Sequence, residues 1–184
     1  MEGELRGNIV AARNVLQSHG WCAAGVFGRQ FSISDLRPLI ELATGDPLFS
    51  WERELQDSEY FQSLLNLRLR HYQKYGFGVH GIWLEDRLVG QCGLQVLNED
   101  LDRVEMVIFL GNAFTHRGLG SQLSRYLVLK CRECGMTALY GVARTDNPEA
   151  IALMVKLAAV RLEDIIHFRR KATVFALDLT KEVR

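Results

Sequence analysis

The spacing of hydrophobic residues predicts helices early in this chain and strands later. Apolar residues three and four positions apart predict a helix after a cap at Ser34 or Asp35, and a longer helix from residue 57 or 58 to about residue 75. Residues 4–18 indicate a short helix before them, and residues 23–31 indicate a first strand. The early part therefore supplies two main helices after a single strand.

From Phe77 onward the hydrophobic period shortens to two, which is typical of strands. The turn residues 85–87 separate the first two of these strands and predict a hairpin. The expected strands cover residues 79–84, 88–97, 103–110, 137–144, 161–169 and 172–179, with helices that open at Gly118 and at Pro148. This order predicts a mixed α/β fold of the α+β type, with an antiparallel meander, and not a doubly wound parallel sheet.

Composition indicates one ordinary globular domain, since 48% of the 184 residues are hydrophobic and 24% are charged. No repeat or linker divides the chain, so we expect a single domain over residues 23–184 after an N-terminal extension of residues 1–22. The 22 basic residues equal the 22 acidic ones, which disfavours nucleic acid and an anionic membrane as partners. No apolar run approaches the ~20 residues of a membrane span, and the first twenty residues lack a signal peptide's apolar segment. We therefore expect a cytoplasmic protein, with a homodimer left open.

Two of the four cysteines, Cys131 and Cys134, have a spacing that occurs in metal and redox sites. The pair lies inside the helix expected from Gly118, where this spacing also places both thiols beside Leu127 on the buried side. No second Cys or His pair has zinc-site spacing, so we expect packing thiols and no bound metal.

Residues 112–123 join the apolar strand at 103–110 to an amphipathic helix through a glycine turn. Gly118 and Gly120 lack a Cβ, so backbone N–H groups at the helix start can approach an anion closely, and the helix dipole favours a phosphate there. The sequence has neither the Gly-Lys-Ser/Thr of a nucleoside triphosphate loop nor the third glycine of the dinucleotide fingerprint.

Two segments of the chain resemble the GNAT superfamily of acyl-CoA-dependent N-acetyltransferases. Residues 115–120, Thr-His-Arg-Gly-Leu-Gly, match both glycines of the family signature Gln/Arg-x-x-Gly-x-Gly/Ala but begin with Thr115. Residues 147–158 resemble the family's Asn-led helix that ends in Lys-Leu-Gly-Phe, although Ala158 and Ala159 replace Gly-Phe. Further similarity at 31–36, at 46–47 and at 76–78 before Trp83 looks like the branch that contains ribosomal-protein N-terminal acetyltransferases.

The resemblance implies a mostly antiparallel central sheet with helices on both faces, acetyl-CoA as co-substrate, and transfer of an acetyl group to a primary amine. The amine would belong to a protein N-terminus or to a small molecule such as an amino acid, polyamine or aminoglycoside. The residues implied to bind acetyl-CoA are Val107, Ile108, Phe109, Leu110, Thr115, His116, Arg117, Gly118, Leu119, Gly120, Ser121 and Asn147. The residues implied to contact the acceptor are Trp51, Tyr60 and Trp83, which are also candidates for the core.

Glu105 is the candidate general base, because it is a carboxylate on an apolar strand and the family often places its catalytic Glu on this strand. The alternative is a surface residue paired with Arg103. Many family members protonate the leaving thiolate with a Tyr after the last helix, but this chain has no Tyr after Tyr140. The general acid is therefore unassigned, with His167 as a weak substitute.

Three departures from the family pattern favour a second hypothesis: Thr115, the pair Ala158-Ala159, and the absence of a Tyr after Tyr140. In it, a catalytically degenerate GNAT domain binds acyl-CoA as a sensor or scaffold without turnover.

Overall fold

The computed structural model describes residues 7–17, 19–43, 58–167 and 170–181, and these residues form two compact units. Of these residues, unit 1 comprises 7–15, 96–106, 127–167 and 170–181, and unit 2 comprises 16–17, 19–43, 58–95 and 107–126. Strand β5 (Arg103–Leu110) and helix α5 (Leu119–Glu133) each contribute one part to each unit.

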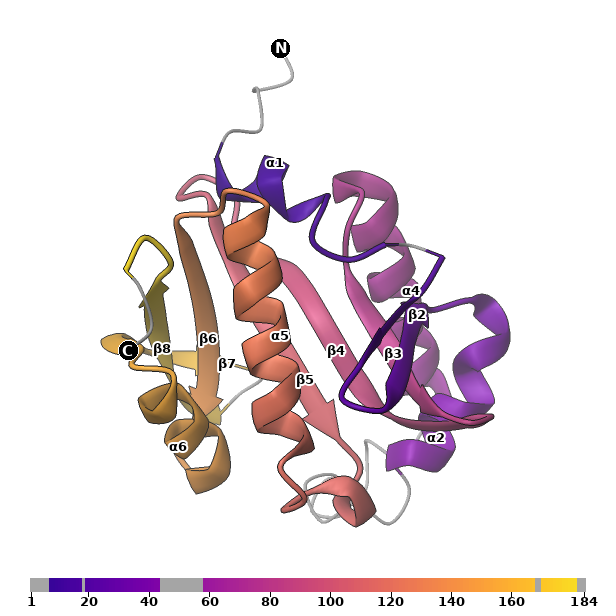
Figure 1. Cartoon of the computed structure of the whole chain (residues 1–184). Coiled ribbons are helices and arrows are strands. Elements are labelled where there is room, and N and C mark those ends of the chain that lie inside the picture. Colours follow the sequence, from indigo (N-terminus) through magenta and orange to yellow (C-terminus); the bar gives the residue numbers. More distant parts are fainter. Residues whose placement is uncertain (1–6, 18, 44–57, 168–169, 182–184) are drawn as a thin grey trace. The chain divides into compact units, whose positions relative to one another are not determined.

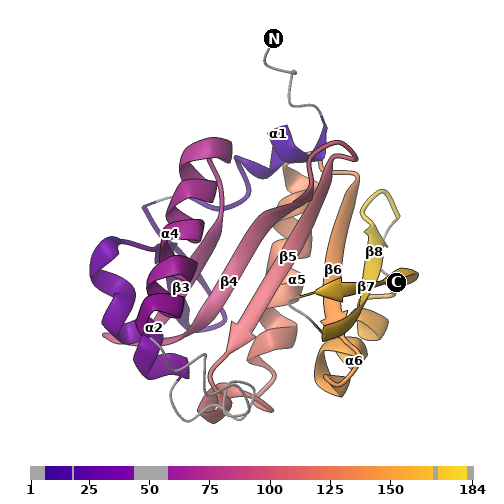
Figure 2. The same ribbon diagram turned by 180° about the vertical axis from the view of Figure 1, so that it is seen from behind.

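The strands of unit 2 follow the order β1 (Trp21–Ala23), β2 (Val26–Gln30), β3 (Val79–Leu84), β4 (Arg87–Asn98) and then the second half of β5. Helices α2 (Leu36–Ala43) and α4 (Ser58–Tyr75) cover one face of these strands, and the first turns of α5 cover the other (Figures 1 and 2). The buried cluster between α2, α4 and the strands consists of Phe31, Leu39, Ala43, Phe61, Leu65, Trp83 and Leu88. The amphipathic helices expected from the sequence therefore bury their apolar sides here.

The single strand expected over residues 23–31 is right only for residues 26–30, which form β2, because the chain reverses at residues 24 and 25. Ala23 pairs with Val26, and the intervening Ala24 and Gly25 both have positive φ, 53° and 78°. Two consecutive positive φ values are typical of a two-residue hairpin turn. The segment therefore forms the hairpin of β1 and β2.

The start of α2 is held by an ion pair in which the Asp35 carboxylate is buried and the Arg29 side chain is partly exposed. The Asp35 carboxylate accepts a hydrogen bond from the Ser32 N–H and two from Arg29, each at 2.8 Å. Burial raises the pKa of Asp35, but these hydrogen bonds outweigh burial and hold the pKa below its usual value. Arg29 also lies 4.4 Å from the centre of the Trp83 ring. The cap predicted at Ser34 or Asp35 lies earlier, because Ser32 is the N-cap of a short 3₁₀ turn (Ile33–Asp35), and Asp35 completes a capping box with it from the third position of the turn.

The strands of unit 1 follow the order β5, β6 (Ala138–Arg144), β8 (Arg170–Asp178) and β7 (Val160–His167). Only the β5–β6 pair is parallel among the strand pairs described in this unit. Helix α6 (Pro148–Lys156) packs on β6 at Gly141, where an added Cβ would come within 2.6 Å of the Met154 sulfur. The mixed, mostly antiparallel fold class is thus confirmed.

The N-terminal segment is anchored in unit 1 through helix α1 (Asn8–Ala12). The Asp102 carboxylate accepts hydrogen bonds from the N–H groups of Asn8, at 2.7 Å, and Ile9, at 2.9 Å. The Asn8 side-chain oxygen accepts a further bond from the Thr137 N–H at 2.8 Å. Residues of the predicted extension are therefore part of this unit's packing. None of the helices in the described part of the chain is long and apolar enough to cross a membrane.

Candidate acyl-CoA site

The glycine turn of unit 2 follows β5 through one 3₁₀ turn, Asn112–Phe114. The Gly111 N–H donates to the Val89 carbonyl at 3.0 Å, and the Thr115 hydroxyl donates to the Asn112 carbonyl at 2.8 Å. His116 and Gly118 both have positive φ, 58° and 78°. These bends bring the chain directly to the first residue of α5.

The first turn of α5 offers N–H groups that have no partner further back in the helix. Leu119, Gly120 and Ser121 are half-buried there, while residues 116–118 are exposed. A Cβ at Gly118 would meet only the Gln122 amide nitrogen, at 3.8 Å, so the space above this glycine is open. Fully buried Leu123 fixes the helix one turn later. An anion could therefore approach the backbone at this turn, as the sequence predicts.

The residues expected along the pantetheine arm, 107–110, are half-buried at the end of β5 in the same unit as this turn. Gly90 of β4 allows the two strands to approach here, because a Cβ on Gly90 would collide with the Phe109 carbonyl oxygen. The strand end and the glycine turn are thus separated by the short segment 111–114.

Glu105 lies in unit 1 on the first half of β5 and is only 5% exposed. Arg103 forms its ion pair with Glu163, at 2.6 Å, and its guanidinium lies 5.2 Å from the centre of the Tyr140 ring. The alternative that Glu105 is a surface partner of Arg103 is therefore wrong. A buried carboxylate on this strand remains the candidate base.

Tyr140 is the residue that the sequence did not assign to the site. It lies opposite Glu105 in the parallel β5–β6 register, so the two side chains share a face of the sheet. No short motif marks Tyr140, because its position depends on a strand pairing between segments far apart in the sequence.

Asn147 caps α6 as predicted, since its side-chain oxygen accepts a hydrogen bond from the Ala150 N–H at 3.0 Å. At the other end of the helix, the Ala158 N–H donates to Val155 and the Ala159 N–H donates to Met154. These two hydrogen bonds close the helix, with Ala158 in the left-handed conformation at φ 57°, where glycine is the usual residue. The departure from Gly-Phe thus keeps the helix end but introduces backbone strain.

The three predicted acceptor contacts have different surroundings. Tyr60 is half-buried against Phe61, with ring centres 5.2 Å apart, and Trp83 is in the core beneath Arg29. Trp51 lies outside the described residues. Contact of these side chains with an acceptor stays a prediction.

The thiols of α5 lie in a packed environment. Cys131 is fully buried, and burial raises its pKa to about 12, so the thiol stays protonated at neutral pH. Cys134 is half-buried, and burial also raises its pKa. Within the described ranges, no group of three or more His, Cys, Asp or Glu side chains is placed to hold a metal ion. His167 is half-buried, and burial lowers its pKa.

Comparison with known proteins assigns this arrangement to a family. Solved structures of similar fold include a GNAT-family acetyltransferase from Bordetella pertussis, at 12% identity and TM-score 0.73 over 86% of this chain and 99% of the other. A protein described as a ribosomal-protein-serine acetyltransferase from Vibrio cholerae has 14% identity and TM-score 0.73, over 89% and 99%. RimL, a ribosomal L7/L12 alpha-N-protein acetyltransferase solved with coenzyme A, has 12% identity and TM-score 0.69, over 84% and 94%. The acetyltransferase (GNAT) family model matches residues 36–158, which include Glu105, the glycine turn and Asn147, and the chain therefore belongs to this family.

Proposed function

We propose that this protein transfers the acetyl group of acetyl-CoA to the nitrogen of a primary amine. One observation carries the proposal: the turn at 115–121 opens α5 with a left-handed glycine and open space above it, within the segment that the family model matches. The RimL structure of similar fold contains coenzyme A, which supports the same ligand class here.

In this proposal the pyrophosphate accepts hydrogen bonds from the backbone N–H groups of residues 117–121. The exposed Arg117 and His116 supply side-chain groups beside it. The pantetheine arm contacts the backbone of residues 107–110, and Asn147 contributes its side chain in addition to capping α6. Thr115 contributes little, because its hydroxyl already donates to the Asn112 carbonyl.

The reaction requires a neutral amine, since only the free electron pair attacks the thioester carbonyl. The pKa of a primary amine is about 8 at a peptide N-terminus and about 10 on an alkyl chain, so most of the amine is protonated at neutral pH. Glu105 is our candidate for the group that accepts the amine proton, directly or through water. A C–N bond then forms, the C–S bond breaks, and the CoA thiolate takes a proton. Tyr140, on the same face as Glu105, is our candidate donor of that proton.

The second candidate function is a non-catalytic acyl-CoA sensor. It is favoured by the Thr115 hydroxyl, which is engaged within the turn, and by the strained Ala158 at the end of α6. Both functions predict binding of acetyl-CoA, so binding alone does not distinguish them.

Two measurements together test the proposal. Titration calorimetry should give a dissociation constant for acetyl-CoA in the micromolar range. CoA release should then depend on one class of amine in a panel of amino acids, polyamines, aminoglycosides and peptides with free N-termini. Binding without amine-dependent CoA release would favour the sensor, and absence of acetyl-CoA binding would overturn both functions.

A further inference from the structure

Strand β7 lies at one end of the sheet in unit 1, where the strand order is β6, β8 and then β7. Within the described ranges, no strand pairs with its other edge. Three of its aliphatic side chains, Val160, Leu162 and Ile166, are 64%, 46% and 69% exposed. An unpaired strand edge presents backbone N–H and C=O groups to which a further strand can be added. Strand β7 is therefore a surface at which another chain can pair.

The features that usually protect an edge strand are weak in β7. The strand contains neither Lys nor Pro. Its Arg161 forms an ion pair with Asp164 at 2.7 Å, and its Glu163 forms one with Arg103 of β5 at 2.6 Å. These charges are thus neutralised within the unit, and they oppose an incoming strand less than unpaired charges do.

Hydrogen bonds on the far side of β8 determine which backbone groups of β7 point to the free edge. The Thr145 N–H donates to the Lys171 carbonyl at 3.0 Å, so Lys171 directs its backbone groups away from β7. Ile166 lies opposite Lys171, and the two therefore form a non-hydrogen-bonded pair. The backbone groups of Ile166 point to the free edge, as do those of Asp164 two residues earlier, whereas Ile165 is hydrogen-bonded to β8.

Charge restricts how two such edges can pair with each other. Two copies of one strand pair antiparallel about a two-fold axis, so the residue on the axis defines the register. An axis at Glu163 or Asp164 places two carboxylates opposite each other, which is unfavourable. An axis at Ile166 leaves only the end of the strand to pair. An axis at Ile165 places Asp164 opposite Ile166, so that the outward-pointing backbone groups meet.

The register with Ile165 on the axis also matches side chains across the edge. Ile165 lies opposite its own copy, and each Glu163 lies opposite the His167 of the other copy. An imidazole can donate a hydrogen bond to a carboxylate, and a carboxylate has enough acceptor sites to keep its bond from Arg103 as well. The strand is therefore complementary to itself.

We infer that two copies of this chain associate through the free edges of β7, antiparallel and with the two-fold axis at Ile165. Main-chain hydrogen bonds between residue 164 of one copy and residue 166 of the other supply affinity, as in other strand additions. The order of Glu163, Ile165 and His167 favours a second copy over an unrelated partner. Because the contact is short, we expect a dissociation constant in the micromolar range.

This pairing relates the candidate catalytic groups of the two copies. Ile165, Ala172 and Arg144 lie in register across β7, β8 and β6. Arg144 is four residues from Tyr140 on β6, so both side chains share the face that carries Glu105. A two-fold axis at Ile165 is perpendicular to the sheet. The faces that carry Glu105 and Tyr140 therefore lie on the same side of the extended sheet.

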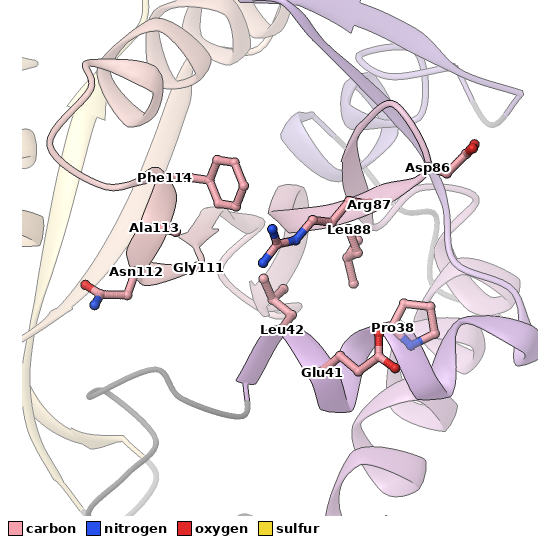
Figure 3. A pocket seen from close by; sticks show the side chains of 10 residues that line it. All are labelled: Pro38, Glu41, Leu42, Asp86, Arg87, Leu88, Gly111, Asn112, Ala113 and Phe114. Carbon is pink, nitrogen blue, oxygen red and sulfur yellow. The ribbon is translucent and has the colours of Figure 1, made fainter.

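Unit 2 offers a different kind of surface, a cavity of about 610 Å³ beside residues 111–114 (Figure 3). Glu41, Asp86 and Arg87 contribute charged groups to its lining. Its volume falls within the range of roughly 300–1,000 Å³ that is common for small-molecule sites, whereas strand addition needs an unpaired edge. A substitution in this cavity, such as Arg87→Glu, should therefore leave the association of copies unchanged.

Sedimentation velocity measures the association. The protein should change from a monomer of 20.9 kDa toward twice that mass between about 1 and 300 µM. Ile166→Glu places a second carboxylate opposite Asp164 in both symmetric pairs and should weaken the dimer about tenfold. Ile166→Lys places an opposite charge there and should preserve the dimer. The control is Leu129→Glu, which introduces the same charge at an exposed aliphatic residue of α5 in unit 1.

Engineered disulfides test the register. In a non-hydrogen-bonded pair the Cα atoms are about 4.5 Å apart, which a disulfide can bridge, so Ile165→Cys should form a covalent dimer on mild oxidation. The background is Cys22→Ser, since Cys22 is the exposed native cysteine. Ile166→Cys is the matched control: Ile166 is more exposed than Ile165 but lies opposite Asp164, so it should cross-link poorly.

Three results would overturn the inference. The first is a monomer at every concentration, and the second is equal weakening of the dimer by Ile166→Glu and Leu129→Glu. The third is faster cross-linking of Ile166→Cys than of Ile165→Cys, as random collision predicts. Thermal unfolding of each variant separates a lost contact from a lost fold. None of these measurements depends on catalysis, so the inference and the proposed acetyl transfer fail separately.

Discussion

Gly118 and Gly135 have almost the same backbone conformation, with φ of +78° and +80°, but only Gly118 lies in the proposed pyrophosphate turn. A Cβ would meet nothing closer than 3.8 Å at Gly118 and nothing within 4 Å at Gly135. Alanine at either position should therefore cost about 1 kcal/mol of stability through left-handed strain alone. We expect acetyl-CoA affinity to fall about tenfold or more in Gly118→Ala only.

Thermal unfolding and titration calorimetry of the two variants separate strain from ligand binding. Unchanged affinity in folded Gly118→Ala would exclude this turn as the phosphate site. A loss of affinity in Gly135→Ala as well would mean that strain, and not the Cβ at the turn, weakens binding. Bulkier residues such as Val are less informative here, because a β-branched side chain adds strain of its own at positive φ.

Replacing Glu105 with Gln keeps the shape of the buried side chain and removes the proton acceptor. If Glu105 is the general base, turnover should fall by roughly tenfold to a thousandfold while acetyl-CoA affinity stays nearly constant. The control is Glu163→Gln, which removes the exposed carboxylate that pairs with Arg103. Steady-state kinetics on the best acceptor measures both variants. Full turnover in Glu105→Gln would remove this residue from the proposed mechanism.

The ends of α5 and α6 have the same hydrogen-bond pattern and differ in the residue at the left-handed position. Gly135 occupies it after α5, and Ala158 occupies it after α6. We therefore expect Ala158→Gly to raise the free energy of unfolding by about 0.5–1 kcal/mol, because glycine relieves the strain but adds some unfolded-state entropy. Denaturant unfolding monitored by circular dichroism measures the gain. A loss of stability would show that the Ala158 methyl group makes packing contacts worth more than the strain.

Elements with a strong local pattern could be predicted from the sequence. The bounds of β3 and β5 match the alternating segments 79–84 and 103–110, and Asn147 with Pro148 marks the start of α6. The β1–β2 hairpin could not be predicted, since its turn begins with Ala24, a residue that rarely adopts positive φ. The glycine turn and Glu105 were found because their residue types carry the chemistry. Tyr140 was not, because its proposed role depends on a strand pairing with a segment far away in the sequence.

Stability of the folded molecule should fall in acid because of one buried histidine. His80 is fully buried, accepts a hydrogen bond on Nδ1 from the Trp21 indole at 2.9 Å, and has its pKa lowered by burial from 6.5 to about 4. His80 therefore binds a proton more readily in the unfolded state than in the folded state. The stabilisation is fully present above pH 6.5 and is lost as the pH falls toward 4, by about 3 kcal/mol in all.

Unfolding free energies at pH 7 and pH 4.5 measure this loss. In His80→Gln, whose amide oxygen can still accept the Trp21 hydrogen bond, the difference between the two pH values should shrink. His71 contributes with the same sign, since burial lowers its pKa also, so a smaller slope should remain. An unchanged slope in His80→Gln would show that other groups control the acid sensitivity.

The hydrogen bonds that anchor helix α1 limit when unit 1 can fold during synthesis. Asn8 leaves the ribosome early, but its partners Asp102 and Thr137 are added 94 and 129 positions later. At about 5–20 residues per second, a nascent chain waits on the order of ten seconds before the second partner exists. Until then the segment around Asn8 is open to chaperones. Strand β7 likewise emerges before β8, which separates it from β6. The order of translation therefore opposes the order of packing in this unit, and the unit should complete its folding only after β8 has been synthesised.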